Sequence, residues 1–378
     1  MQEKEMIDAL SIRDLEVLFR PFHYRKIDLP TRIVMAPMTR GFSPDGIPTD
    51  AVAEYYKRRA ENEVGLIITE GTMIDEPSAS PSVNYPNFFG GPALRGWKHV
   101  VEAVHRTDAK IAPQLWHVGM ARPFEGEMPN PDLPPIGPSG IELSGFRQVA
   151  EPMTKAKIAE TIDAFARGAY AAKKLGFDAV EIHGAHGYLI DQFLWERTNR
   201  RTDEYGGGIF ERTKFARDVV IAVRRAVGRR FPIIFRFSQW KMDHYDARLA
   251  NTPGELQVIV HALSEAGVDI FHCSTRRFWE PAFESSPLSL AGWTKKITGK
   301  PTIAVGSVGL DRMFLDEGKG SLSLSSLNPL VQRMRAGEFD LIAVGRALLA
   351  DPAWAAKVHG SREEEIHCFS KDDLATLS

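Results

Sequence analysis

The chain has 378 residues and a formal net charge of −2, from 47 Lys and Arg against 49 Asp and Glu, and no basic run that would indicate nucleic-acid binding. Its two cysteines, Cys273 and Cys368, are too few for a disulfide framework or a four-cysteine iron–sulfur site, which fits a reducing cytoplasm. The N-terminus resembles no signal peptide and no apolar stretch approaches about 18 residues, so we expect a soluble, cytoplasmic protein without a membrane partner.

Eight short apolar runs recur along the chain, each followed by a helical pattern or by a loop that leads to one. Apolar strands that alternate with amphipathic helices are typical of a parallel sheet buried on both faces. The count of eight predicts an α/β fold, a single (β/α)8 TIM barrel. A doubly wound open sheet is the alternative, but it would normally carry a glycine fingerprint, and neither GxGxxG nor GxxxxGK[ST] occurs. The runs cover residues 32–35, 64–69, 111–115, 179–182, 232–235, 269–272, 302–305 and 340–344.

Helical periodicity separates these runs. It is clearest over 154–175, where Gly176 supplies the residue type that commonly ends a helix. The same spacing predicts helices over 49–60, 210–227 and 252–266.

The predicted organisation is one barrel domain over residues 20–360, with an N-terminal extension at 1–19 and a C-terminal tail at 361–378. The connection at 116–152 is rich in Pro and Gly and follows the third strand, so we expect it to lie on the catalytic face and to cap the site. The Ser- and Gly-rich segment 318–326 is interpreted as a flexible insertion of unassigned role.

Three proton-bearing side chains follow the fourth predicted strand. His183, His186 and Tyr188 lie within six residues and are separated only by Gly184, Ala185 and Gly187, which suits a turn that presents side chains to a ligand. Two imidazoles can donate to one carbonyl oxygen. A phenol with its ordinary pKa of about 10 is protonated at neutral pH and can act as an acid.

The same residues allow other interpretations. A histidine pair is often structural, and His-x-x-His can ligate a metal, with Glu181 or Asp191 as a further ligand. Zinc is disfavoured because cysteine is nearly absent and no third ligand stands at a usual spacing. We therefore expect no metal site, and the charged segment 200–207 can equally be a solvated loop.

A family resemblance adds to this interpretation. The run HGAHGYLIDQFL at 183–194, followed by NRRTDEYGG at 199–207, resembles the signature of the Old Yellow Enzyme family of FMN-dependent ene-reductases. The resemblance implies a barrel that binds FMN, takes hydride from NADPH or NADH, and delivers it to the β-carbon of an α,β-unsaturated carbonyl or nitro compound. It also implies that His183 and His186 bind the substrate oxygen and that Tyr188 protonates the α-carbon.

Other strand ends should contribute to the same site, because the carboxyl ends of barrel strands converge on one pocket. After the first strand, Ala36, Pro37, Met38 and Thr39 resemble the family's flavin-contacting loop, in which Thr39 would bond the pyrimidine side of the ring. A turn with a capping threonine is the alternative.

Polar residues inside two apolar strands need partners. By resemblance, Gln114 pairs with the edge of the flavin and Trp116 walls the pocket, whereas a structural glutamine is the alternative. Arg236 is interpreted as a fixed cation that stabilises negative charge on the reduced flavin. A salt bridge from Arg236 to Glu181 or Glu70 inside the barrel is the competing explanation.

The last two strands predict a phosphate site. Gly306 and Ser307 follow one strand, and Gly345 and Arg346 follow the other. Bare backbone N–H groups can approach phosphate oxygens there, and an arginine adds a bidentate cation. Unrelated barrels bind phosphate at this place too, so the feature indicates a phosphorylated ligand and no particular reaction.

The resemblance covers roughly residues 20–360. The His-His pair together with Thr39 departs from the usual combination, so the subgroup stays open. The two cysteines exclude the relatives that carry an iron–sulfur cluster. A non-redox barrel, an aldolase or isomerase acting on a phosphorylated sugar, is the rival, and a ligand-binding barrel without catalysis is a third possibility. Neither the pattern nor the resemblance fixes the oligomeric state, the physiological substrate or the choice between NADH and NADPH.

Overall fold

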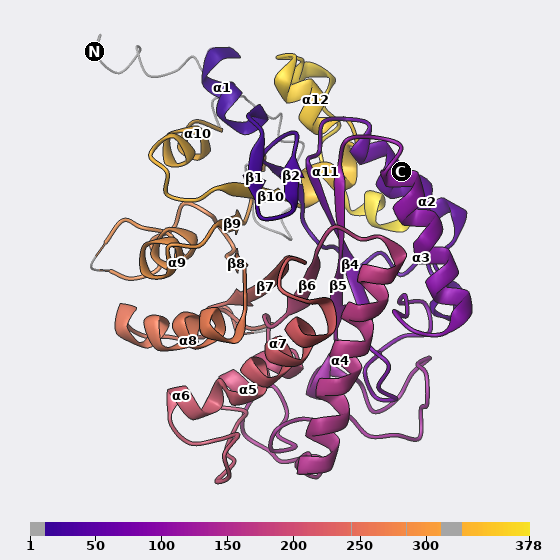
Figure 1. Cartoon of the computed structure of the whole chain (residues 1–378), viewed down its shortest axis with the longest axis vertical. Coiled ribbons are helices and arrows are strands. Elements are labelled where there is room, and N and C mark those ends of the chain that lie inside the picture. The colour runs from indigo at the N-terminus through magenta and orange to yellow at the C-terminus, as the bar shows by residue number, and fades with distance from the viewer. Residues whose placement is uncertain (1–11, 243, 285, 311–326) are drawn as a thin grey trace.

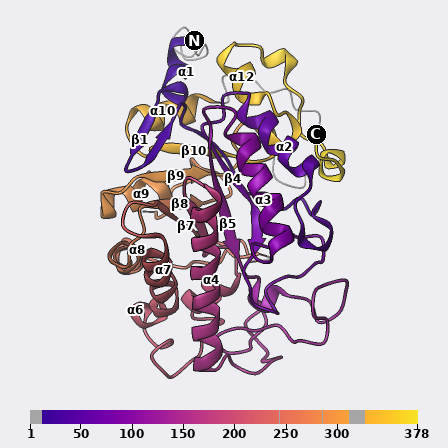
Figure 2. The same ribbon diagram turned by 45° about the vertical axis from the view of Figure 1, so that its right-hand side comes forward.

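The computed structural model describes residues 12–242, 244–284, 286–310 and 327–378. Within this part, eight parallel strands close into a barrel, and the helices lie outside it (Figures 1 and 2). The predicted (β/α)8 architecture is confirmed. The predicted insertion at 318–326 lies outside the described residues.

The barrel strands follow one another around the ring in chain order, with β10 closing against β3. Each strand is buried, which explains why the sequence shows continuous apolar runs rather than alternation. The barrel strands are β3 (Ile33–Met35), β4 (Leu66–Met73), β5 (Lys110–Trp116), β6 (Val180–His183), β7 (Ile233–Ser238), β8 (Ile270–Ser274), β9 (Thr302–Val305) and β10 (Leu341–Val344).

The helix α4 (Lys155–Leu175) shows how the sequence sets its own ends. Thr154 Oγ1 accepts a hydrogen bond from Lys157 N, and Gly176 ends the helix with a φ of 95°, in the left-handed region. The other helices are α1 (Ile12–Phe19), α2 (Asp50–Ala60), α3 (Gly91–Val104), α5 (Leu189–Leu194), α6 (Ile209–Arg212), α7 (Lys214–Val227), α8 (Pro253–Ala266), α9 (Leu290–Thr298), α10 (Asn328–Arg335), α11 (Arg346–Ala350) and α12 (Trp354–His359), with 3-10 turns η2 (Pro44–Gly46), η3 (Gly119–Ala121), η5 (Glu363–Glu365) and η6 (Lys371–Ala375).

The single helix expected at 210–227 is divided into α6 and α7. Thr213 lies between them, and its Oγ1 donates to the carbonyl of Phe210 at 2.6 Å. A hydroxyl that bonds back to the preceding turn competes with regular helix geometry, which accounts for the break.

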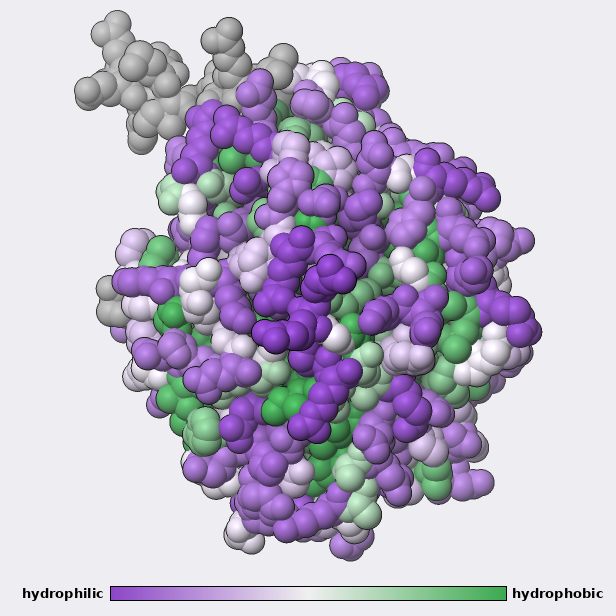
Figure 3. Space-filling view, in the orientation of Figure 1, coloured by the Kyte–Doolittle hydropathy of each residue, from purple (hydrophilic) through white to green (hydrophobic). Residues whose placement is uncertain are grey.

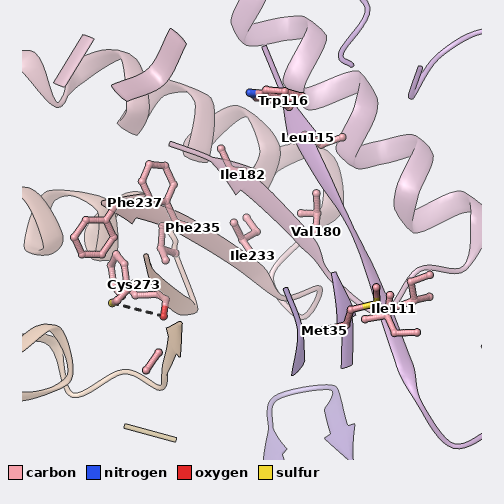
Figure 4. Close-up of a cluster of buried hydrophobic side chains, with 14 of the residues drawn as sticks. Met35, Ile111, Leu115, Trp116, Val180, Ile182, Ile233, Phe235, Phe237 and Cys273 are labelled. Atoms are coloured by element: carbon pink, nitrogen blue, oxygen red, sulfur yellow. Dashed lines mark hydrogen bonds between the residues drawn. The ribbon is translucent and has the colours of Figure 1, made fainter. Parts of the chain in front are cut away.

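Side chains alternate along each barrel strand between the interior and the helix layer. Val180, Ile182 and Phe235 belong to the core between strands and helices (Figure 4). Ala179 and Ile234 belong to a separate apolar cluster inside the barrel. The residues two positions further along each strand therefore also face the interior, nearer the carboxyl end.

A β-hairpin closes the barrel at the amino ends of its strands. Its strands, β1 (Phe22–Tyr24) and β2 (Ile27–Leu29), bury apolar side chains against the interior cluster. Between them, Arg25 pairs with Asp269 at 2.9 Å and donates to the carbonyl of Arg229 at 2.8 Å. Asp269 and Arg229 precede β8 and β7, so the hairpin covers the amino ends of the strands.

Both terminal segments contact the barrel. Leu15 and Leu18 of α1 are buried in the main core. Arg40, in the loop after β3, donates to the carbonyl of Asp373 near the C-terminus at 3.0 Å. Hydrophilic residues cover most of the face shown in Figure 3. Among the described helices, none is long and apolar enough to cross a membrane.

Candidate functional site

The turn after β6 gathers the three predicted catalytic side chains. The ring centroids of His183 and His186 lie 5.2 Å apart, and those of His183 and Tyr188 lie 5.1 Å apart. Trp116, at the end of β5, has its ring centroid 4.8 Å from that of Tyr188 and 5.8 Å from that of His183. The four residues named from the sequence are therefore neighbours.

Glycine and a hydroxyl fix the first half of this turn. A Cβ on Gly184 would lie 2.5 Å from the ring of Phe235, so a side chain does not fit there. His186 has a φ of 65°, a left-handed conformation that is uncommon for a residue with a side chain. Its backbone N–H donates to Ser238 Oγ at 3.0 Å, and its carbonyl accepts from Met242 N at 3.0 Å. These bonds hold the strained residue in place.

A buried ion pair fixes the second half. Gly187, which also has a positive φ of 82°, donates from its N–H to Asp191 Oδ2 at 2.7 Å. The other carboxylate oxygen of Asp191 accepts from Lys241 Nζ at 2.8 Å, and both side chains are almost fully buried. Breaking such a pair leaves an uncompensated buried charge, so the pair strongly opposes displacement of the turn.

The two histidines are uncharged near neutral pH. Burial, and then the charge of Arg236, hold the pKa of His183 and of His186 well below the ordinary value. A neutral imidazole carries one N–H donor and one acceptor nitrogen. The pair can therefore offer two N–H groups to a ligand without adding charge.

A cavity of about 330 Å³ opens beside this turn at the carboxyl ends of the strands. The predicted residues that line it come from the loops after β3, β6, β9 and β10 and from β7. They are Ala36, Pro37, Met38, His186, Arg236, Gly306, Ser307, Gly345 and Arg346. The lining, as far as the structure describes it, contains no Asp or Glu, so its charge is positive.

Two predicted cofactor contacts lie outside that lining. Thr39 is exposed, one residue after the cavity-lining Met38. Its loop is held by Glu70, whose Oε2 accepts from the N–H groups of Arg40 at 2.8 Å and Gly41 at 3.2 Å. Burial raises the pKa of Glu70 to about 7.

Gln114, the second of these residues, is buried inside the barrel. Its Nε2 donates to Glu181 Oε1 at 2.7 Å, and Glu181 Oε2 lies 2.6 Å from His272 Nδ1. Among the described residues, neither Glu181 nor Glu70 forms an ion pair with Arg236, so the salt bridge considered from the sequence is absent there. Among the described residues, the side-chain amide of Gln114 has Glu181 as its one hydrogen-bond partner, and its contact with a flavin stays a prediction.

The loops after β9 and β10 form a close-fitting backbone cradle. Gly306 has a φ of 145°, and a Cβ on it would lie 2.6 Å from the carbonyl oxygen of Thr275. Ser307, with a φ of 50°, donates from Oγ to the carbonyl of Arg276 at 2.9 Å. Gly345 directly precedes α11, which begins at Arg346. Burial, and then Arg276, lower the pKa of Arg346, so two guanidinium groups are close at this end of the cavity.

Several lining residues were missed by the sequence prediction. The sixth strand was expected to end at His272, but β8 continues to Ser274, so Ser274 and the following Arg276 were not considered as strand-end residues. If the strand had been extended to Ser274, the criterion used for the other strands, that residues at a carboxyl strand end face the pocket, would have identified both residues. Trp240, stacked on His186 with ring centroids 4.4 Å apart, and Tyr245, with Arg276 3.8 Å from its ring centroid, lie in a loop without a sequence signal.

The cavity fits FMN. Arg236 is buried, and its Nε has no hydrogen-bond partner among the described residues, so a cation is held ready for a ligand acceptor. The Gly306 cradle leaves backbone close to the cavity, and Arg346 stands beside it, as a phosphate group requires. Within the described residues, no cluster of three or more His, Cys, Asp or Glu could hold a metal ion.

Comparison with known proteins identifies similar chains. Residues 17–365 match the model of the NADH:flavin oxidoreductase / NADH oxidase family. An NADPH dehydrogenase from Geobacillus sp. (strain WCH70) is 33% identical over 350 residues, which cover 91% of this chain and 95% of that protein. A solved structure of morphinone reductase in complex with tetrahydroNAD superposes with a TM-score of 0.78 at 27% identity, covering 94% of this chain and 93% of that one.

A relative of different length matches as well. An NADH oxidase from Thermoanaerobacter brockii is 33% identical over 369 residues, which cover 93% of this chain and 52% of that protein. The chain thus spans about half the length of that relative.

Proposed function

The chain belongs to the NADH:flavin oxidoreductase / NADH oxidase family and is therefore an FMN-dependent oxidoreductase, and we propose that, with NADH or NADPH as reductant, it reduces the C=C bond of α,β-unsaturated carbonyl or nitro compounds. The membership agrees with the family that the sequence motif indicated. The observation that supports the C=C reaction is the convergence of His183, His186 and Tyr188 beside the cavity.

Bound FMN would supply hydride transfer, from the nicotinamide to the β-carbon of the substrate. Arg236, Gly306, Gly345 and Arg346 would hold it, with Arg236 toward the ring and the others toward the phosphate. A fixed, buried cation suits a group that gains negative charge on reduction. Thr39 and Gln114 are proposed as further contacts at the pyrimidine side.

The two imidazoles would bind the substrate oxygen. Because His183 and His186 are neutral, each can donate one N–H, and two donors to one oxygen withdraw electron density from the conjugated C=C bond. This polarisation prepares the β-carbon for hydride. Donors that stand in place before the reaction need no reorganisation as charge develops on the oxygen.

Tyr188 would supply the proton. Its ring packs against those of His183 and Trp116, which places the phenol next to the oxygen-binding pair. Its Oη lies 3.7 Å from Met242 Sδ, a weak acceptor that competes little for the proton. Trp116 would form the wall that keeps a planar substrate in position.

The experiment separates the two half-reactions. In Tyr188→Phe, stopped-flow reduction of the enzyme by NADPH or NADH should be nearly unchanged, whereas reoxidation by a weakly activated enone should slow by ~10²- to 10⁴-fold, the usual loss on removing a general acid. Reoxidation by a nitroalkene should be largely spared, because a stabilised nitronate can form without that proton. Tyr170→Phe, on the outer face of α4, is the matched control and should change neither half-reaction.

Equal slowing with both oxidants would argue against a proton donor. A purified protein that is colourless and cannot be reconstituted with FMN would favour the non-redox phosphate-binding barrel instead.

A further inference from the structure

Ser274 links the two residues that the proposed function assigns to different ligands. It is the last residue of β8 and is 2% exposed. Its Oγ lies 2.7 Å from His186 Nε2 and 3.3 Å from Arg236 Nη2. One hydroxyl thus touches both a residue proposed to bind the substrate and a residue proposed to hold the flavin.

The alternation along the strands explains why these groups meet. Ser238 and Ser274 are paired in register on β7 and β8, as are Arg236 and His272 two positions earlier. All four therefore face the interior. Ser238 Oγ accepts a hydrogen bond from the backbone N–H of His186, and this bond holds the imidazole near the end of β8.

Counting donors fixes the direction of both hydrogen bonds. A guanidinium can only donate, so Ser274 Oγ accepts from Arg236. The hydroxyl has a single hydrogen, and His186 Nε2 is its remaining partner among the described residues. A buried hydroxyl hydrogen without an acceptor costs free energy, so it points to Nε2. Nε2 is then the acceptor nitrogen of a neutral ring, and the N–H lies on Nδ1.

The neighbouring imidazole has the other tautomer. The backbone N–H of Ala185 donates to His183 Nδ1 at 3.3 Å, so the acceptor nitrogen of His183 is Nδ1 and its N–H lies on Nε2. The two rings are almost perpendicular, with an interplanar angle of 89°. Opposite tautomers let two perpendicular rings each keep one bond to the protein and one N–H for a ligand.

We propose that Ser274 is a positioning residue that holds His186 as the Nδ1–H tautomer, so that Nδ1–H is the donor to an acceptor oxygen of the ligand. Arg236 supports this role, because its donation to Oγ occupies a lone pair of the hydroxyl and directs the hydrogen to His186. The role of Nδ1–H as a donor to substrate rests on the proposed function, whereas the tautomer of His186 depends only on hydrogen bonds within the protein.

The test is a ¹⁵N NMR measurement on FMN-loaded protein labelled at histidine, in which the two ring nitrogens of a neutral imidazole have distinct pyridine-type and pyrrole-type shifts. His186→Asn identifies the His186 signals by their loss. In the wild type, Nε2 should show the pyridine-type shift and Nδ1 the pyrrole-type shift. In Ser274→Ala, the two types should exchange between the nitrogens or average.

Two control variants distinguish the effect of losing the Ser274 hydroxyl from the effect of changed packing. Ser274→Thr keeps the hydroxyl and should retain the wild-type pattern. Thr302→Val, at the amino end of β9, removes a buried hydroxyl that has no partner among the described residues, and it should also retain the pattern. If Ser274→Ala does not fold, Ser274→Cys, with only a weak donor, takes its place.

A wild-type His186 with its N–H on Nε2, or as a mixture, would overturn the proposal. So would an Nδ1–H pattern that persists in Ser274→Ala. As a second readout, phenol should bind the alanine variant roughly two- to tenfold more weakly than it binds wild type, the worth of one ordinary hydrogen bond. If phenol does not perturb the wild-type flavin spectrum at all, the proposed function fails, whereas the tautomer is still decided by the nitrogen shifts.

Discussion

The two ends of the barrel each bury a charged side chain, and they treat it differently. At the amino end, Asp269 is paired with Arg25 and Arg224 and accepts the backbone N–H of Ile233, so its carboxylate is fully engaged by the protein. At the carboxyl end, Arg236 has Ser274 as its hydrogen-bond partner among the described residues, and its Nε has none. A buried charge with complete partners supports the fold, whereas one with an incomplete set indicates a ligand.

The surroundings of Asp269 and Arg236 differ in the same way as their hydrogen-bond partners. Asp269 directly precedes Ile270 of the apolar interior cluster, at the end of the barrel that the β1–β2 hairpin covers. Arg236 lies close to Ser274 and to the imidazoles of His183 and His186, and each imidazole keeps one N–H for a ligand. We therefore expect substitutions at the amino end to change stability alone and substitutions at the carboxyl end to change ligand binding.

The largest effect on stability should come from the hairpin. Ile27 is fully buried in the interior cluster, and Ile27→Ala should lower the free energy of unfolding by about 2–5 kcal/mol through lost burial and a cavity. Urea denaturation of the FMN-free protein measures this loss. Lys26→Ala, an exposed neighbour in the same turn, should stay within about 0.5 kcal/mol of wild type.

Because the two ends of the barrel act independently, Ile27→Ala and Lys26→Ala should both bind FMN with the wild-type dissociation constant. A large change in FMN affinity for Ile27→Ala at a temperature where the protein is folded would mean that the two ends are coupled, and the division between them would be wrong.

The converse change is Arg236→Ala. Losing a charged hydrogen-bond donor to bound FMN should weaken its binding by roughly ten- to a hundredfold, since such a bond contributes about 1.5–3 kcal/mol. The flavin reduction potential should also fall, because a cation that favours the reduced form is lost. The FMN-free protein should not be destabilised, since removing a buried, incompletely paired charge relieves a desolvation cost. Arg236→Lys keeps the positive charge but loses the planar guanidinium, so its FMN affinity and reduction potential should lie between those of wild type and Arg236→Ala.

Fluorescence titration of FMN into the stripped protein, together with dye-based potentiometry, measures these quantities. Wild-type affinity and potential in Arg236→Ala would refute the assignment of this side chain to the flavin.

The fold could be predicted from the sequence because strands buried on both faces leave continuous apolar runs, and helices with glycine ends separate them. Nine of the twenty residues that line the cavity could be predicted for a related reason, since barrel geometry brings all carboxyl strand ends together wherever they lie in the chain. Gly306 and Arg346 were found in this way.

The remainder of the site depends on where strands end, on which side chains meet inside the barrel and on loop contacts, and the apolar runs do not mark these. Glu181 meets His272 across the barrel interior only because both occupy inward positions at the same height, and Ser274 was missed because the apolar run that marks β8 ends before the strand does. Trp240 and Tyr245 line the cavity from a loop in which Lys241 forms a buried ion pair with the distant Asp191, a contact that has no local sequence signal.

The most direct test of the account is a phenol titration of the flavin spectrum in wild type, His186→Ala and His186→Asn. A phenolate oxygen mimics the substrate oxygen, so wild type should bind it with a spectral change. His186→Ala should bind it roughly ten- to a hundredfold more weakly, for the loss of one donor to a charged oxygen at about 1.5–3 kcal/mol. His186→Asn keeps an N–H donor and should retain most of the affinity. Similar dissociation constants for all three proteins would mean that His186 does not face the ligand, and would contradict the proposal that this pair binds the oxygen of an unsaturated substrate.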